Sequence, residues 1–217
     1  MIEAHPATDD LVNSLVGQLR PVPHNVIPLR LALGVVVGGV VALILLLFVI
    51  GARPDLVTVL GSRAFLSKTA YMLSTAGVSV LAVSRLARPD SDTKILWILP
   101  IPLLLYLPVG IWELARTDSS QWMAMLMGHG WQLCTWLVLF LTAPIFVALW
   151  WAFRKFAPTN VEAAGAVSGL SASAIASVIY CLHCPTDTAV FALVWYTLAF
   201  AIAAMLGGAT GRYLLRW

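Results

Sequence analysis

Six long apolar stretches alternate with short polar connections along the chain. A helix needs about twenty consecutive apolar residues to cross a hydrocarbon core of about 30 Å. The stretches cover residues 31–51, 65–86, 95–114, 133–153, 163–182 and 189–208. This pattern predicts an all-α integral membrane protein in which six transmembrane helices form a bundle.

In three of the predicted helices, particular residues indicate how the helix should bend or pack. Lys68 lies near the start of the second, where its ammonium is expected to snorkel to the membrane surface. The third contains Pro100, Pro102 and Pro108 and is expected to be kinked or locally unwound. The fifth is built mainly from Gly, Ala and Ser, which suits close helix packing.

The composition agrees with this pattern. Hydrophobic residues make up 60% of the 217 residues and charged residues only 11%, whereas a soluble domain carries about 25% charged residues. A chain with so little polar surface needs lipid around much of it. No aspartate or glutamate is predicted at mid-membrane depth, where such a residue usually marks a transport pathway.

The distribution of Lys and Arg predicts the orientation, because cytoplasmic loops carry an excess of both. With the N-terminus inside, the outer side holds four of them, Arg53, Arg63, Lys68 and Arg116. The inner side then holds nine: Arg20, Arg30, Arg85, Arg88, Lys94, Arg154, Lys155, Arg212 and Arg216. We therefore expect both termini in the cytoplasm of a bacterium, with residues 31–217 as a multi-pass inner-membrane domain and residues 1–30 as a cytoplasmic tail.

The tail contains a short amphipathic pattern over residues 8–20. Thr8 or Asp9 is expected to cap the helix and Pro21 to end it. Its apolar stripe comprises Leu11, Val12, Leu15, Val16 and Leu19. Because so short a helix is marginal alone in water, we expect it to be ordered only against a partner.

Three partners for this helix remain open: the membrane surface, the cytoplasmic loops of its own bundle, and a groove on another protein. An interfacial helix favours Lys and Arg on its polar face and aromatics on the other. This helix instead carries Asp9 and Asp10 and no aromatic residue. The pattern therefore favours a protein partner over anionic lipid.

All three cysteines are predicted at the outer face. Cys134 begins the fourth helix, and Cys181 and Cys184 lie where the fifth ends, with His129 and His183 nearby. An oxidising compartment would allow a disulfide from Cys134 to Cys184 or to Cys181. The same side chains are also suitable ligands for zinc, cadmium or a similar thiophilic ion, and a single buried cysteine can simply fill space.

The Cys181-x-x-Cys184 spacing also suggests thiol–disulfide catalysis. A quinone-coupled membrane oxidoreductase relays electrons between two cysteine pairs, and three cysteines cannot form two pairs. A metal transporter would need ligands at mid-depth, which no predicted helix supplies. The pattern favours a regulatory binding protein, not an enzyme, with thiol oxidoreductase and metal transporter as alternatives.

Nearly the whole chain resembles the NrsF family of membrane-bound anti-sigma factors. Residues 180–187, Tyr-Cys-Leu-His-Cys-Pro-Thr-Asp, are similar to the family's aromatic-x-x-His-Cys-Pro-x-Asp element, and Trp195-Tyr196 follows at the family's distance. The glycine-rich 207–208 and the terminal 211–217 also match, and residues 10–22 are similar to the family's tail helix ending in Pro-Val.

The resemblance implies a function for both ends of the chain. The tail would hold an extracytoplasmic-function sigma factor inactive at the inner membrane through Asp9, Asp10, Leu11, Val12, Leu15, Val16 and Leu19. Heavy metal or oxidant would act from outside on Cys134 and Cys184, with His183 and His129 as further candidate metal ligands. No cofactor beyond a transient metal, and no nucleic acid, is implied, and glycine-rich fifth and sixth helices would permit a homodimer.

Overall fold

The computed structural model describes residues 6–17, 26–88, 93–128, 130–153, 156 and 158–214, and all the regular structure in these ranges is helical. The elements in chain order are α1 (Pro6–Gly17), α2 (Val26–Leu45), the π-helical turn η1 (Leu46–Ile50), α3 (Leu56–Val59), α4 (Arg63–Leu86), the 3-10 helix η2 (Thr93–Ile98), α5 (Ile101–Ala115), η3 (Ser119–Gln121), α6 (Trp122–Met127), α7 (Trp131–Phe153), α8 (Val161–Tyr180), α9 (Ala189–Phe191), the π-helical turn η4 (Ala192–Tyr196) and α10 (Thr197–Leu214).

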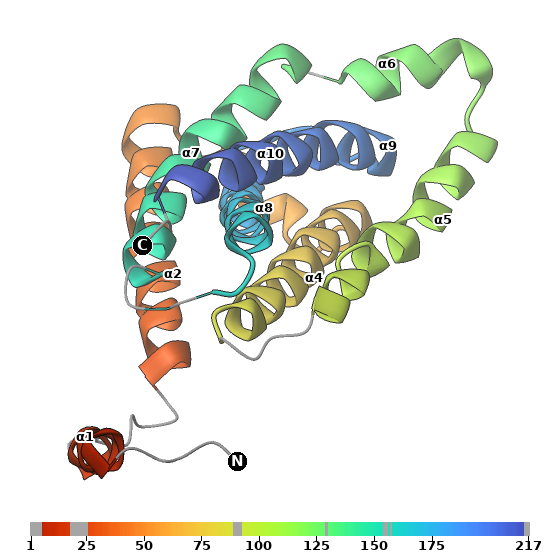
Figure 1. Cartoon of the computed structure of the whole chain (residues 1–217). Coiled ribbons are helices and arrows are strands. Elements are labelled where there is room, and N and C mark those ends of the chain that lie inside the picture. Colours follow the sequence, from red (N-terminus) through yellow and green to blue (C-terminus); the bar gives the residue numbers. More distant parts are fainter. Residues whose placement is uncertain are drawn as a thin grey trace.

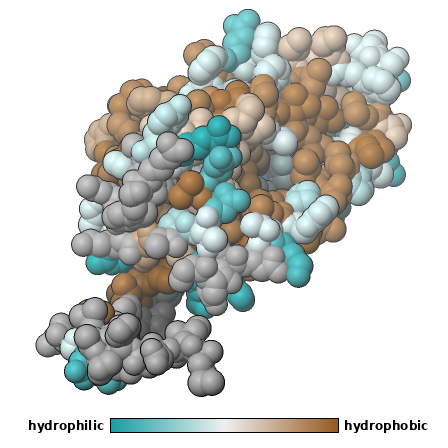
Figure 2. Space-filling view, viewed as in Figure 1, coloured by the Kyte–Doolittle hydropathy of each residue, from teal (hydrophilic) through white to brown (hydrophobic). Residues whose placement is uncertain are grey.

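Six helical segments are long and apolar enough to cross a membrane, as the sequence predicts. They are Val26–Ile50, Arg63–Leu86, Thr93–Ala115, Ser119–Phe153, Val161–Tyr180 and Ala189–Tyr213. Large apolar side chains lie open on the outside of the bundle, such as Phe48, which is 85% exposed, and Trp97, which is 81% exposed. Much of the bundle's visible face is therefore apolar (Figure 2), which is unusual for a surface in contact with water.

Glycines allow two pairs of helices to pack closely. A Cβ added to Gly34 of α2 would lie 3.0 Å from the Ala148 carbonyl oxygen of α7. A Cβ added to Gly38 would lie 2.6 Å from the Ile145 Cα of the same helix. A Cβ on Gly207 of α10 would overlap the backbone of α8. Figure 1 shows α2 beside α7, with α8 between α7 and α4. The glycines of the fifth and sixth predicted helices thus pack against each other inside the chain.

These packed pairs also fix the direction of the helices. The start of α2 lies beside the end of α7, and Gly211 near the end of α10 lies against Val161 at the start of α8. Phe153 at the end of α7 lines the same cavity as Gly165 of α8 and Gly211 of α10, so the start of α2 and the end of α10 are at the same end of the bundle.

The third predicted helix is interrupted where its first proline falls. The 3-10 helix η2 ends at Ile98, and α5 begins after Pro100, with Pro102 in its first turn. Proline suits a first turn because its missing N–H would have no partner there. The expected local unwinding is confirmed at this point.

The N-terminal helix α1 lies apart from the bundle (Figure 1). It begins at Pro6, so the prediction that Thr8 or Asp9 caps it is wrong: both residues lie inside the helix, because proline can occupy the first turn. Leu19 and Pro21 lie outside the described residues, as do the side chains of Asp9 and Leu11.

Candidate functional site

One end of the bundle gathers the three cysteines, and we call it the cysteine end. It comprises the loop after η1, the start of α4, the start of α7 and the connection 181–188 between α8 and α9. Cys134 lies in the first turn of α7, and Cys181 and Cys184 lie in the connection. All three are free thiols, each only 1% exposed.

The thiols of Cys134 and Cys184 lie close enough to interact directly. The end of α8 brings this about, because the Cys184 amide donates to the Tyr180 carbonyl at 3.0 Å and folds the chain back over the last turn. Cys181 lies instead near Thr69 of α4. Of the two pairings that the sequence left open, the structure brings the sulfurs of Cys134 and Cys184 together.

Two tyrosines enclose this pair. The Tyr180 side chain lies near Cys134, and that of Tyr196 lies near Cys184. Their ring centroids are 6.1 Å apart, and Tyr196 is fully buried. Tyr196 ends the π-helical turn η4, a kind of irregularity that is frequent at functional sites. The thiol pair therefore lies in an aromatic pocket that excludes water.

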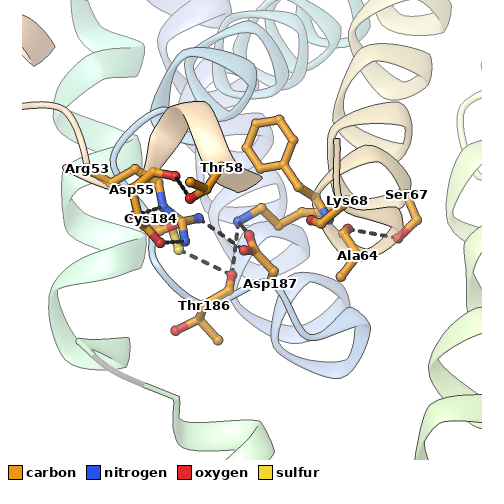
Figure 3. A network of polar contacts seen from close by, with 11 residues as sticks. Arg53, Asp55, Thr58, Ala64, Ser67, Lys68, Cys184, Thr186 and Asp187 are labelled. Carbon is orange, nitrogen blue, oxygen red and sulfur yellow. Dashed lines mark hydrogen bonds and ion pairs between the residues drawn. The ribbon is translucent and has the colours of Figure 1, made fainter. Parts of the chain in front are cut away.

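A network of buried charges lies next to Cys184 (Figure 3). Lys68 Nζ is 2.7 Å from Asp187 Oδ1 and donates to the Thr186 carbonyl at 2.9 Å. The prediction that Lys68 snorkels is wrong, because its side chain is fully buried. Lys68 faces the interior of the bundle, where Asp187 supplies the counter-charge that a buried ammonium needs.

Arg53 completes this network from the loop after η1. Its Nη1 donates to Asp187 Oδ2 and to the Cys184 carbonyl, both at 3.0 Å. Its Nε and Nη2 donate to the carboxylate of Asp55 at 2.8 Å. The hydrogen bond to Asp55, followed by the one to Asp187, raises the pKa of Arg53 above its usual value, and Arg53 lowers the pKa of Asp55. We call Arg53, Lys68 and Asp187 the charge network.

The two cysteines of the connection differ in electrostatics. Burial raises the pKa of Cys181 to about 11. The hydrogen bond from Cys134, and then the positive charge of Lys68, lower the pKa of Cys184 despite its burial. Cys184 is therefore the thiol of the connection that more readily becomes a thiolate, the form that attacks oxidants and binds soft metals.

The predicted histidine ligands do not join the thiol pair among the described residues. His183 Nδ1 lies 2.7 Å from the Gly51 carbonyl oxygen, which ties the connection to the loop after η1. His129 lies outside the described residues. Within the described ranges, no three His, Cys, Asp or Glu side chains are grouped as a metal centre requires. A metal at this site would therefore rely on the sulfurs of Cys134 and Cys184.

A short helix covers the connection beside the cysteines. Trp195 Nε1 donates to the Leu126 carbonyl of α6 at 2.8 Å, and the Thr188 hydroxyl donates to that of Met125 at 3.3 Å. Gly128, with φ +51°, lets the chain turn tightly after α6, where a Cβ would lie 2.8 Å from Thr186. An open recess of about 410 Å³ lies between α6 and residues 185–188.

Sequence reasoning missed the charge network. Asp187 stands in the motif at 180–187, but nothing local reveals which cations it binds. Arg53 and Lys68 are separated from Asp187 by 134 and 119 residues. Lys and Arg near a membrane surface are common, so only the fold distinguishes these two.

The fold and the site define a bundle of six apolar helices with a buried thiol pair at one end and a separate helix at its N-terminus. The chain belongs to the NrsF family: the family model, described as negative regulator of sigma F, matches residues 15–217.

Two relatives match along nearly their whole length. The "Anti-sigma-F factor NrsF" of Caulobacter vibrioides is 36% identical over 214 residues, covering 97% of this chain and 99% of the relative. The "Probable anti-sigma-F factor NrsF" of Azospira oryzae is 34% identical over 216 residues, with the same coverage. No solved structure matches the chain.

Proposed function

We propose that this chain holds an extracytoplasmic-function sigma factor inactive at the bacterial inner membrane and releases it when heavy metal or oxidant acts on Cys134 and Cys184. The chain is an anti-sigma factor by family, which makes it a regulator and not an enzyme. The single observation that carries the sensing part is the contact between the thiols of Cys134 and Cys184.

The tail provides the binding surface for the sigma factor. Val12, Leu15 and Val16 of α1 are between 49% and 58% exposed, although all three are apolar. A surface helix keeps such a stripe only if something covers it in the working complex. Asp10, which is also exposed, suits the basic surfaces with which a sigma factor binds DNA, and Asp9, Leu11 and Leu19 are the other proposed contacts.

The bundle provides the membrane anchor. Six apolar helices and the excess of Lys and Arg on one side support a multi-pass protein with both termini in the cytoplasm. In this orientation the cysteine end faces the outer compartment, where metals and oxidants arrive first. The tail then faces the compartment that holds sigma factors.

Two chemistries at the thiol pair fit this proposal. An oxidant can accept two electrons as the two thiols lose two protons and form a disulfide between Cys134 and Cys184. A thiophilic ion such as cadmium can instead displace protons from the sulfurs and bridge them. The thiol oxidoreductase alternative is not favoured, because Cys184 has Cys134 as its thiol partner and not the C-x-x-C neighbour Cys181.

The test is co-purification from membranes with the sigma factors of the same cell. The full chain should retain one sigma factor, and a triple Val12→Ser, Leu15→Ser, Val16→Ser variant should lose it, while the polar-face change Asn13→Ala should not. Cadmium chloride should release the retained sigma factor unless Cys134 and Cys184 are both changed to Ser, with Cys181→Ser as the matched control. Retention by none of these proteins would refute the proposed function.

A further inference from the structure

We propose that Asp187, together with Arg53 and Lys68, is the positioning group that transmits a change at the thiol pair to α2, the helix that leads to the N-terminal tail. This inference rests on the proposed function and names its internal route. It concerns residues that touch neither metal nor oxidant, so their role is to couple and not to sense.

Asp187 connects the cysteine segment to two other parts of the bundle. One carboxylate oxygen binds Arg53, from the loop that follows α2 and η1, and the other binds Lys68 of α4. Both cations also hold the backbone of the same segment, at the carbonyls of Cys184 and Thr186. Lys68 and the Cys184 thiol share the Thr186 carbonyl as an acceptor, the thiol at 3.6 Å. The segment from Cys184 to Asp187 therefore cannot shift without moving these cations.

The loop after η1, which continues from α2, makes further hydrogen bonds to residues 182–183, beside this segment, in addition to the ion pair. The Arg53 amide donates to the Leu182 carbonyl at 3.0 Å, and His183 Nδ1 contacts the Gly51 carbonyl at 2.7 Å. Arg53 is itself only 8% exposed. The Arg53 and Lys68 side chains are buried and that of Asp187 is only 16% exposed, so their ion pairs are stronger than pairs on an open surface.

The other support of α2 is α7, the helix that carries Cys134. Gly34 and Gly38 bring the α2 backbone against Ala148 and Ile145 of α7. Helix α2 is thus connected indirectly to both cysteines of the thiol pair. It contacts α7, which carries Cys134, and the loop that follows it binds the Cys184 segment through the charge network. A disulfide or a bridging metal changes the distance between these two supports. Because a helix is stiff, α2 must tilt or slide in response, and its far end is the one that continues toward the tail.

The experiment uses the full chain in lipid nanodiscs with its sigma factor bound. The probes are cadmium chloride and, separately, diamide, which takes up the two electrons and two protons that the thiols lose on forming a disulfide. Asp187→Asn removes the negative charge at similar volume, and Arg53→Gln tests the link to α2 by itself. Glu162→Gln is the matched control, since it removes the carboxylate of an exposed ion pair with Arg212, away from the cysteines.

We expect Asp187→Asn and Arg53→Gln to retain the sigma factor without a probe. Because Lys68 without its counter-charge changes the reactivity of Cys184, release is compared at probe doses that bridge Cys134 and Cys184 to the same extent in each protein. Induced release should fall about tenfold, the size of a typical coupling between sites, and Asp187→Glu should restore part of it. Glu162→Gln should release normally. Release from Asp187→Asn equal to that of the unchanged chain, or loss of the sigma factor before any probe is added, would overturn the inference.

A second measurement separates this inference from the proposed function. Amide hydrogen exchange along residues 26–45 should change when the thiols of the unchanged chain are bridged, and should not change in Arg53→Gln. If the unchanged chain never releases a sigma factor, the proposed function fails, and this exchange result alone decides the inference. If Asp187→Asn does not fold, Arg53→Gln decides it. Equal exchange changes in both proteins would show that α2 moves without the charge network.

Discussion

The cysteine end and the N-terminal helix α1 are built in opposite ways. At the cysteine end, polar groups are buried and bonded to residues more than a hundred positions away, as with Lys68 and Asp187. In α1, apolar side chains such as Leu15 lie open and the helix stands apart from the bundle. The first region is complete within the chain, whereas the second needs another molecule. The proposed function, a sensor that reports to a separable partner, would require this division.

The largest effect is expected from removing the counter-charge at the cysteine end. Asp187→Ala leaves the fully buried ammonium of Lys68 without its carboxylate. Breaking a buried ion pair in this way costs about 3–5 kcal/mol, and thermal unfolding in detergent should show it as a large fall in midpoint. The matched change Glu162→Ala breaks an exposed pair, worth about 0–1 kcal/mol. Similar midpoints for the two variants would contradict the account of the charge network.

The next effect is expected at α1 and should leave the bundle unchanged. Burying a leucine or valine contributes about 1.5–3 kcal/mol, so Leu15→Ser should weaken sigma-factor binding by at least about tenfold. Isothermal titration with the purified chain measures it, with Asn13→Ala as the control. The unfolding midpoint of the bundle should not move. A lower midpoint without weaker binding would place α1 on its own bundle instead.

A smaller effect is expected between these two regions, at adjacent glycines of α2. Gly38→Ala places a Cβ 2.6 Å from the Ile145 Cα, and such overpacking costs about 1–3 kcal/mol. Gly39→Ala meets nothing within 4 Å and should be neutral or slightly stabilising. The difference between the two thermal midpoints tests the packing of α2 on α7. Equal midpoints would mean that this contact is loose.

The smallest effect is expected in thiol reactivity. Cys184, with its lowered pKa, should alkylate faster than Cys181 near pH 7 once both are exposed to the same small reagent. The pKa of Cys181 is about 11, so its rate should keep rising with pH well above neutrality, while that of Cys184 levels off earlier. Cys134→Ser should change the profile of Cys184 and not that of Cys181. Mass spectrometry of the two peptides gives both rates, and a faster Cys181 would contradict this order.

The six helices could be predicted because each depends on its own composition. The stretches at 31–51 and 133–153 correspond to Val26–Ile50 and to the end of Ser119–Phe153 with little ambiguity. The start of α1 could not be predicted, since Pro6 in the first turn competes with Thr8 and Asp9 as a start signal. Local sequence patterns therefore predicted which segments are helical better than they predicted the residue at which the tail helix begins.

The candidate site was only partly within reach of the sequence. The family resemblance at 180–187 implied Cys134 and Cys184 as the pair, whereas the cysteine positions alone left Cys181 open as a partner for Cys134. The fold distinguishes them, because the turn after Tyr180 carries Cys184 and not Cys181 toward α7. The prediction that Lys68 snorkels failed for a similar reason. Snorkelling is expected for a lysine on a single helix in lipid, and the sequence did not reveal that Asp187, on a distant connection, would pair with Lys68 inside the bundle.

The burial of Lys68 has a consequence for the synthesis of the chain. Arg63–Leu86 is the least apolar of the six spans, with a mean hydropathy of 1.2, and Lys68 pairs with a residue translated 119 positions later. At ribosomal speeds that interval is on the order of ten seconds. In the proposed membrane topology, the ammonium of the nascent second helix needs water as its partner until Asp187 emerges. The fifth helix and the connection that follows it must therefore arrive before the second helix can take its final place.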